Sequence, residues 1–285
     1  MELDTRDVTL HYEDDGDPDA PPILVLHGIT QSSATWGWLV PHLAARHRVV
    51  RLDFRGHGRS GRTPGRYGFR GYVEDATAVC ERVLRGPTVI VGHSLGGGTA
   101  AAVAQARPDL VRGVVLEDPP LLGAGAEDVA GLPGNSLLEG FRLMRESVPQ
   151  LQAAGMAPAE LVETLRGVPS PSGPAFGELS YDDALDAMAE ALLQLDATVL
   201  DPVLEGRSEP VFDPLRELPV PGIVLAADPA MSDAVTRPQD LDRLRKHSPL
   251  VECRVVTGSG HLIHDSRQHR QVVLDAVQEL LARLT

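Results

Sequence analysis

Apolar positions fall in short, nearly continuous runs that are separated by stretches with helical spacing. Runs such as Ile23-Leu24-Val25-Leu26 and Val114-Val115-Leu116 contain no alternating polar positions. A strand that is covered on both faces has this composition, and such strands belong to parallel sheets. The predicted strands are Arg6–Tyr12, Ile23–His27, Arg48–Asp53, Thr88–Gly92, Val111–Asp118, Ile223–Ala227 and Val251–Thr257.

Helix-like stretches lie between these strands, and the last stretch shows the pattern most clearly. Its apolar side chains have the spacing of one helix face, at Val272, Val273, Val277, Leu280 and Leu281. The predicted helices are Trp38–Ala45, Tyr72–Leu84, Gly96–Ala106, Pro238–His247 and Gln268–Leu284. The alternation of strands with helices predicts an α/β fold with a doubly wound, mostly parallel sheet.

Residues 119–219 interrupt this alternation with a Gly- and Pro-rich segment that has little strand character. Helical stretches are predicted in it near Ser136–Glu146, Pro158–Arg166 and Tyr181–Leu195. An insertion of this length exceeds ordinary connections, and it follows a strand, so it should lie over the sheet edge where α/β proteins bind ligands. We therefore expect a core domain of residues 1–118 and 220–285, with residues 119–219 forming a helical cap.

The charge balance narrows the expected partners. The 285 residues contain 26 Lys and Arg against 40 Asp and Glu, which gives a formal net charge of −14. A surface this acidic repels nucleic-acid phosphates and anionic lipid heads, so we expect no nucleic acid and no membrane partner. The N-terminus lacks the basic and apolar parts of a signal peptide, which predicts a cytoplasmic protein. The oligomeric state is left open, and a homodimer is one state that the sequence permits.

The two cysteines, Cys80 and Cys253, lie in different predicted elements and have no Cys or His partners at the spacing of a metal site. Two buried thiols are therefore favoured over a disulfide or a zinc site.

The stretch Thr88–Gly97 has the pattern of a strand, a tight turn and a helix around one serine. The turn itself is Gly92-His93-Ser94-Leu95-Gly96, in which the two glycines allow neighbouring elements to approach closely. Such a turn lifts the Ser94 hydroxyl above the sheet and directs the Leu95 amide, at the helix start, toward an incoming oxyanion. The sequence predicts Ser94 as a nucleophile and Leu95 as an oxyanion donor.

A second stretch, Leu26-His27-Gly28-Ile29, ends an earlier buried strand. Gly28 allows a sharp exit from that strand, and the Ile29 amide is the candidate for a second oxyanion donor. His27 is expected to support the loop by hydrogen bonding.

Together with two further motifs, these stretches resemble the α/β-hydrolase superfamily. The four motifs stand in the family's order and are His27-Gly28, Asp53-Phe54-Arg55-Gly56-His57-Gly58-Arg59-Ser60, Gly92-His93-Ser94-Leu95-Gly96-Gly97 and Gly258-Ser259-Gly260-His261. The resemblance implies the α/β-hydrolase fold and a structural role for the motif that begins at Asp53. A serine at the turn differs from the carboxylate that epoxide hydrolases and haloalkane dehalogenases of this superfamily use.

The candidate general base is His261, which follows the last predicted strand behind a flexible Gly-Ser-Gly. A loop at that edge of the sheet can reach Ser94. The family resemblance also places the base directly after the glycine. His264 is the competing histidine, and we interpret it as a hydrogen-bonding residue on the surface or facing the cap.

Four carboxylates compete for the role of the acid that orients His261. The resembled family places this acid after either the sixth or the seventh strand. Asp118, preceded by Glu117, follows the sixth strand, and Asp228 and Asp233 follow the seventh. The loop after the seventh strand departs from the Gly-Asp-x-Asp-like turn of the family, which favours Asp118. Glu117, Asp228 and Asp233 remain alternatives, and any of the four carboxylates could instead cap a strand end.

The predicted function is hydrolysis of a carboxylic ester or lactone through an acyl-enzyme with a Ser-His-Asp triad. This mechanism implies no metal and no organic cofactor. A C–C bond hydrolase, an amidase or a cofactor-free haloperoxidase-like perhydrolase would use the same triad. A ligand receptor or signalling protein of the same fold, without turnover, is a further alternative. The length and apolar residues of the predicted cap favour a mid-sized, apolar small molecule as the substrate.

Overall fold

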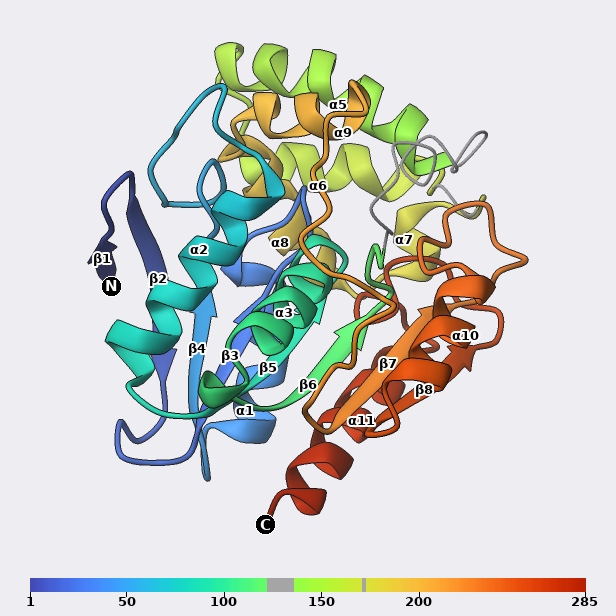
Figure 1. The fold of residues 1–285 in the computed structure, drawn as a ribbon. Helices are drawn as coiled ribbons and strands as arrows, with labels where there is room; N and C mark the ends of the chain where they lie inside the picture. Colours follow the sequence, from blue (N-terminus) through green and yellow to red (C-terminus); the bar gives the residue numbers. More distant parts are fainter. Residues whose placement is uncertain (122–135, 171–172) are drawn as a thin grey trace.

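The computed structural model describes residues 1–121, 136–170 and 173–285. These residues form an eight-stranded sheet with the strand order β1-β2-β4-β3-β5-β6-β7-β8 (Figure 1). The strands are β1 (Glu2–Asp4), β2 (Thr9–Asp15), β3 (Pro22–Leu26), β4 (Arg48–Leu52), β5 (Thr88–His93), β6 (Val111–Glu117), β7 (Gly222–Ala227) and β8 (Val251–Val256). Strands β1 and β2 pair antiparallel, and β3 to β8 pair parallel, which confirms the predicted α/β class.

Helices cover both faces of this sheet. One face packs against α2 (Phe69–Val79), α3 (Leu95–Ala106) and α10 (Pro238–His247). The other face packs against η1 (Ser33–Leu39), α1 (Val40–Leu43) and α11 (Arg270–Arg283). Short helical turns follow α2 and α3, at η2 (Cys80–Leu84) and η3 (Pro108–Leu110).

The central strands supply apolar side chains to both covering layers. In β3, Leu24 and Leu26 face the α2–α3 layer, whereas Ile23 and Val25 face the α11 layer. Successive side chains of a strand point to opposite faces, so only a continuous apolar run can fill two layers at once. The unbroken runs read from the sequence are therefore the strands at the centre of the sheet.

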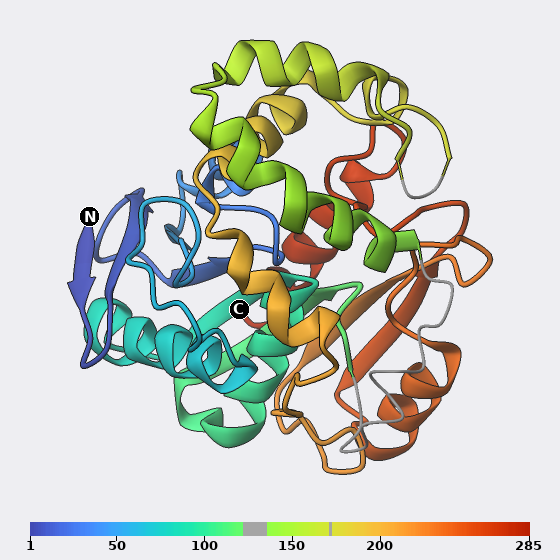
Figure 2. The same ribbon diagram turned by 90° about the horizontal axis from the view of Figure 1, so that it is seen from above.

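A group of helices between β6 and β7 lies at the end of the sheet to which the parallel strands point (Figure 1). These helices, called the inserted helices below, are α5 (Ser136–Ala153), α6 (Pro158–Gly167), α7 (Phe176–Leu179), α8 (Asp182–Leu193), η4 (Ala197–Leu200) and α9 (Asp201–Leu204). Seen from above, they cover part of that edge, and the C-terminus lies at the opposite end of the molecule (Figures 1 and 2). Residues 122–135 and 171–172 of the predicted cap lie outside the described residues.

The first predicted strand, Arg6–Tyr12, is displaced in the structure. Residues 6–8 belong to the turn between β1 and β2, and β2 extends instead through Glu13, Asp14 and Asp15. Arg48 and Arg51 on the neighbouring strand form ion pairs with Asp14 and Asp15. Arginines that are distant in the sequence but adjacent in the sheet thus stabilise an acidic segment that has weak strand propensity of its own.

Two further expectations need correction. The predicted helix Trp38–Ala45 starts inside a 3₁₀ helix, η1, which ends at Leu39, and only four of its residues form α-helix, in α1. Of the two free cysteines, Cys80 is buried as predicted, but Cys253 is only half-buried. Among the described residues, no helix combines the length and the apolar character that a membrane crossing requires.

Candidate active site

Ser94 occupies a strained turn between β5 and α3. Its backbone has φ +50° and ψ −116°, a conformation that a residue other than glycine rarely adopts. A Cβ atom added at Gly92 would lie 2.4 Å from the Gly96 carbonyl oxygen, and one at Gly96 would lie 2.4 Å from that of Leu26. The glycines therefore permit the close approach of strand and helix that places Ser94 above the sheet edge.

Asp118 follows β6 directly and is completely buried. Its Oδ1 accepts hydrogen bonds from the Ala227 and Thr236 amides at 3.1 and 2.9 Å. Its Oδ2 accepts from the Val235 amide at 3.0 Å and from His261 Nδ1 at 2.6 Å. Burial raises the pKa of this carboxyl, but the hydrogen bond and charge of His261 and the amides outweigh burial, so the pKa lies below its ordinary value. The carboxylate is held ionised against the imidazole.

His261 lies in the loop after β8 and is almost fully buried. Because Nδ1 donates to Asp118, Nε2 is the nitrogen left for proton transfer. Ser94 and His261 line the same cavity. Within the described part of the chain, no hydrogen bond joins their side chains. Such contacts often tighten only when a substrate is bound.

The other candidate acids accept hydrogen bonds from groups other than the His261 ring. Oε1 of Glu117 accepts hydrogen bonds from the backbone amide and Nδ1 of His264, at 2.9 and 2.8 Å. Asp228 accepts from the amides of Gly258 and Ala230, so it caps two turns. Oδ2 of Asp233 lies 3.2 Å from the backbone amide of His261 and accepts from it. Of the four carboxylates, the structure brings only Asp118 against the His261 ring.

The two candidate oxyanion donors both line the cavity that contains Ser94. Leu95 is the first residue of α3, so its amide has no acceptor within the helix. The loop that carries Ile29 is held by His57, whose Nε2 donates to the Ile29 carbonyl oxygen at 2.6 Å. His27 donates through Nδ1 to the Gly28 carbonyl oxygen and accepts at Nε2 from the Phe54 amide, which gives it the supporting role expected from the sequence.

A buried polar network that the sequence did not reveal joins this loop to the His261 loop. Gln31 Oε1 accepts from the Gly28 amide and from His93 Nδ1, both at 2.8 Å. Gln31 Nε2 donates to His264 Nε2 at 3.1 Å, and His264 Nδ1 donates to Glu117. These residues come from four separate segments and carry no local motif, so only the tertiary structure shows the network.

His264 has the hydrogen-bonding role expected from the sequence, but the expected surface location is wrong, because the residue is completely buried. Its ring stacks on Trp36 with the ring centroids 4.6 Å apart. Burial lowers the pKa of His264, but the carboxylates of Asp265 and Glu117 outweigh burial and raise it. Burial and the neighbouring imidazoles lower the pKa of His93 well below its ordinary value.

Part of this network also has the donor types of a metal site. One ligand atom each of His93, Glu117 and His264 lies within 4.8 Å of the others. Hydrogen bonds among these residues and Gln31 already engage both ring nitrogens of His264 and Nδ1 of His93. We therefore describe the group as a hydrogen-bond network.

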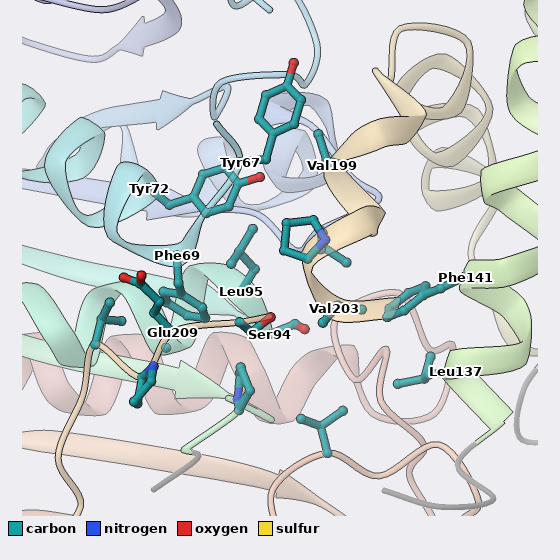
Figure 3. A pocket seen from close by; sticks show the side chains of 18 of the residues that line it. Tyr67, Phe69, Tyr72, Ser94, Leu95, Leu137, Phe141, Val199, Val203 and Glu209 are labelled. Carbon is teal, nitrogen blue, oxygen red and sulfur yellow. The ribbon is translucent and has the colours of Figure 1, made fainter. Parts of the chain in front are cut away.

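The cavity beside Ser94 divides into two chambers. The Tyr72 chamber is lined by Tyr67, Phe69, Tyr72, Val203 and Phe212 (Figure 3). The Met144 chamber is lined by Met144, Phe176, Met188 and Leu192. Both chambers include Ser94 and His261, together with Ile29, Leu137 and Phe141. Two mostly apolar spaces that share Ser94 can hold the two halves of a molecule that is cleaved there.

The fold agrees with the comparisons with known proteins. Residues 21–268 match the family model of the alpha/beta hydrolase fold. The chain belongs to this family, as the resemblance implied. It is 30% identical over 205 residues to 2-(acetamidomethylene)succinate hydrolase of Mesorhizobium japonicum, covering 62% of this chain and 73% of that protein.

Two further matches extend over nearly the whole chain. An sn-1-specific diacylglycerol lipase of Mus musculus, ABHD11, is 28% identical over 287 residues, covering 98% of this chain and 87% of the lipase. The crystal structure of an epoxide hydrolase mutant from Bacillus megaterium superposes with a TM-score of 0.73 at 18% identity, covering 99% and 100% of the two chains. The structural match shows the shared fold alone.

Proposed function

We propose that this hydrolase cleaves a carboxylic ester or lactone through an acyl-enzyme on Ser94. One observation carries the proposal: a serine on a strained strand-to-helix turn shares an apolar cavity with His261, whose Nδ1 is held by the buried Asp118 carboxylate. This combination supplies a nucleophile, a base and the group that orients the base. The diacylglycerol lipase among the relatives has a name that denotes ester cleavage.

The mechanism follows from the positions of these groups. His261 Nε2 takes the proton of Ser94 as its oxygen attacks the carbonyl carbon, and the Asp118 carboxylate stabilises the imidazolium that forms. The amides of Ile29 and Leu95 donate to the tetrahedral oxyanion. His261 then gives its proton to the leaving alkoxide. A water that His261 deprotonates attacks the acyl-enzyme and releases the acid.

Several relatives differ in the reaction that their names denote, so the identity of the bond needs a direct measurement. We expect sustained proton release from a panel of neutral esters and lactones at near-neutral pH, and none from Ser94→Ala. The panel also includes amides and β-diketones, because cleavage of a C–N or C–C bond would use the same three side chains. Amide cleavage is followed by the amine that it releases, since at neutral pH the amine takes up the proton of the acid. Sustained turnover of a β-diketone alone would replace the proposal with a C–C bond hydrolase.

A receptor of the same fold would behave differently in this experiment. It would release at most one equivalent of product while a phosphonate still labelled Ser94 covalently. That outcome would refute the proposal of a turnover enzyme.

A further inference from the structure

One hydroxyl in the Tyr72 chamber lacks a hydrogen-bond partner. Tyr72 belongs to α2 and is 2% exposed, and its phenol oxygen has no partner among the described residues. The ring is fixed by edge-to-face contact with Phe54, at 5.2 Å between centroids, and by His57 at 6.1 Å. Figure 3 shows the hydroxyl turned toward the middle of the chamber. Buried polar groups nearly always form a hydrogen bond, so the unpartnered phenol indicates that a bound molecule supplies the missing partner.

The neighbouring tyrosine provides a contrast within the same chamber. Tyr67 donates to Asp196 Oδ2 at 2.6 Å and accepts from the Thr63 amide at 2.8 Å. Its hydroxyl points away from the chamber in Figure 3. The protein therefore satisfies one phenol through its own structure and leaves the other, on a residue that lines the chamber, without a hydrogen-bond partner among the described residues.

The protonation state of the Tyr72 phenol defines which kind of atom can be its hydrogen-bond partner. Burial raises the pKa of the phenol, so the hydroxyl keeps its proton and is available as a donor. The missing partner is accordingly an acceptor, such as a carbonyl, ether or hydroxyl oxygen. Most of the other lining residues are apolar and can accommodate the hydrocarbon part of the same molecule.

Charge in the chamber excludes an anionic acceptor. The described residues that line it include no Arg or Lys, and Glu209 adds a carboxylate. Arg70, which pairs with Glu209 over 3.7 Å, is largely exposed and does not line the chamber. An ionised carboxylate moved from water into this chamber would lose its hydration without gaining a counterion.

We propose that the substrate is an uncharged ester or lactone whose half in the Tyr72 chamber carries an oxygen acceptor that binds the Tyr72 hydroxyl. The proposal rests on the proposed function, since it names the substrate class of the same site. Tyr72 is thereby a specificity-determining residue. It touches the substrate at a point remote from the bond that is cleaved.

The experiment compares pairs of neutral esters that differ only in one position of a chain, where a methylene is replaced by an ether oxygen or a ketone carbonyl. The position is varied along both the acyl and the alcohol chain. The measured quantity is the ratio of kcat/KM for the two members of a pair. This ratio cancels any loss of folded or active protein in a variant.

For the wild-type protein we expect the acceptor-bearing member of at least one pair to be preferred by about tenfold, the usual net value of one such hydrogen bond. In Tyr72→Phe the ratio should fall to near one. The matched control Tyr67→Phe should keep the wild-type ratio, because its hydroxyl is bonded to the protein. A third ester with a terminal carboxylate at the same position should be the poorest substrate.

Equal ratios in the wild-type protein and Tyr72→Phe, with esters hydrolysed normally, would overturn this inference and leave the proposed function standing. Absence of hydrolysis above the Ser94→Ala background would overturn the proposed function. In that case, calorimetric binding of the same pairs to Ser94→Ala and to the Ser94→Ala, Tyr72→Phe double variant still decides the inference. Tighter binding of the acceptor-bearing ester by Ser94→Ala, lost in the double variant, supports the role of Tyr72. Equal affinities of Ser94→Ala for the two esters of every pair refute it.

Discussion

The Asp118 carboxylate is surrounded by donors that all come from outside its own strand. Three backbone amides and His261 Nδ1 occupy its two oxygens, so the carboxylate has little freedom to turn away from the imidazole. An acid that only capped a strand end would not need a positive φ angle, yet Asp118 has φ +38°. The strain and the four hydrogen bonds both act to fix the direction of one side chain.

We predict that Asp118→Asn lowers the rate of Ser94 acylation by about 10³–10⁴, because an amide favours the wrong tautomer of His261 and cannot stabilise the imidazolium. The matched control is Asp228→Asn, which changes a carboxylate that caps turns of exposed loops. Single-turnover kinetics with an ester that releases a chromophore would give the rates. Near-normal acylation in Asp118→Asn, with a collapse in Asp228→Asn or Asp233→Asn, would move the acid to the loop after β7.

The sequence identified Ser94 and His261 as candidates because each belongs to a local pattern of glycines beside a strand. The acid could not be chosen in the same way. Asp118, Asp228 and Asp233 all follow strands whose carboxyl ends meet at one edge, and the side chain that reaches the imidazole is decided by loop geometry across about a hundred residues of chain. His264 was misjudged for a related reason, since its partner Glu117 is 147 residues away.

At the scale of elements, the site depends on how closely β5, α3 and β3 approach one another. The small residues at the start of α3 are in contact with the backbone of β3 and the end of β5. Alternating strands and helices could be read from apolar patterns, whereas β1 and the acidic half of β2 could not. Strand β1 is held by its antiparallel pairing with β2, and the acidic half of β2 forms ion pairs with Arg48 and Arg51 of β4.

Because of this close approach, replacing a helical glycine by alanine should have opposite effects on stability at the site and far from it. Gly96→Ala places a methyl group 2.4 Å from the Leu26 carbonyl oxygen, so we expect a loss of roughly 1–3 kcal/mol in the free energy of unfolding and reduced activity. Gly140→Ala, within α5, meets nothing within 4 Å and should stabilise by about 0.5–1 kcal/mol. Urea denaturation of the two variants tests both values. Equal stabilities would show that the turn has room for a side chain.

For the whole molecule, buried histidines couple stability to pH in opposite directions. His264 has a pKa raised above its unfolded value, so the stability that it contributes is fully present below about pH 6.5 and is lost as pH rises through its folded pKa. His27, His57 and His93 have lowered pKa values, and their protonation favours the unfolded chain as pH falls below about 6.5. Their effects overlap in the wild-type protein and must be separated by substitution.

We predict that His264→Gln removes the part of the stability that declines as pH rises from about 6.5. The measurement is the free energy of unfolding of the wild-type protein and of the variant, by urea denaturation at several pH values between 6 and 9. The difference between the two should shrink with increasing pH, because the other histidines cancel in the comparison. A difference that stays constant over this range would mean that His264 is equally charged in the folded and unfolded chains.

The loop between β7 and α10 holds Asp118 through its backbone, since the donors at Ala227, Val235 and Thr236 are all amides. Amides are common to every residue except proline, so the side chains of this segment other than Asp228 and Asp233 are freer to vary than the number of residues between the donors. A library that randomises side chains between Ala227 and Val235 but keeps these two aspartates should retain many active members, provided that proline is excluded at the donor positions. One that adds or deletes a single residue there should retain few. Evolution of new specificities in this protein would thus find more room for substitution than for insertion behind His261.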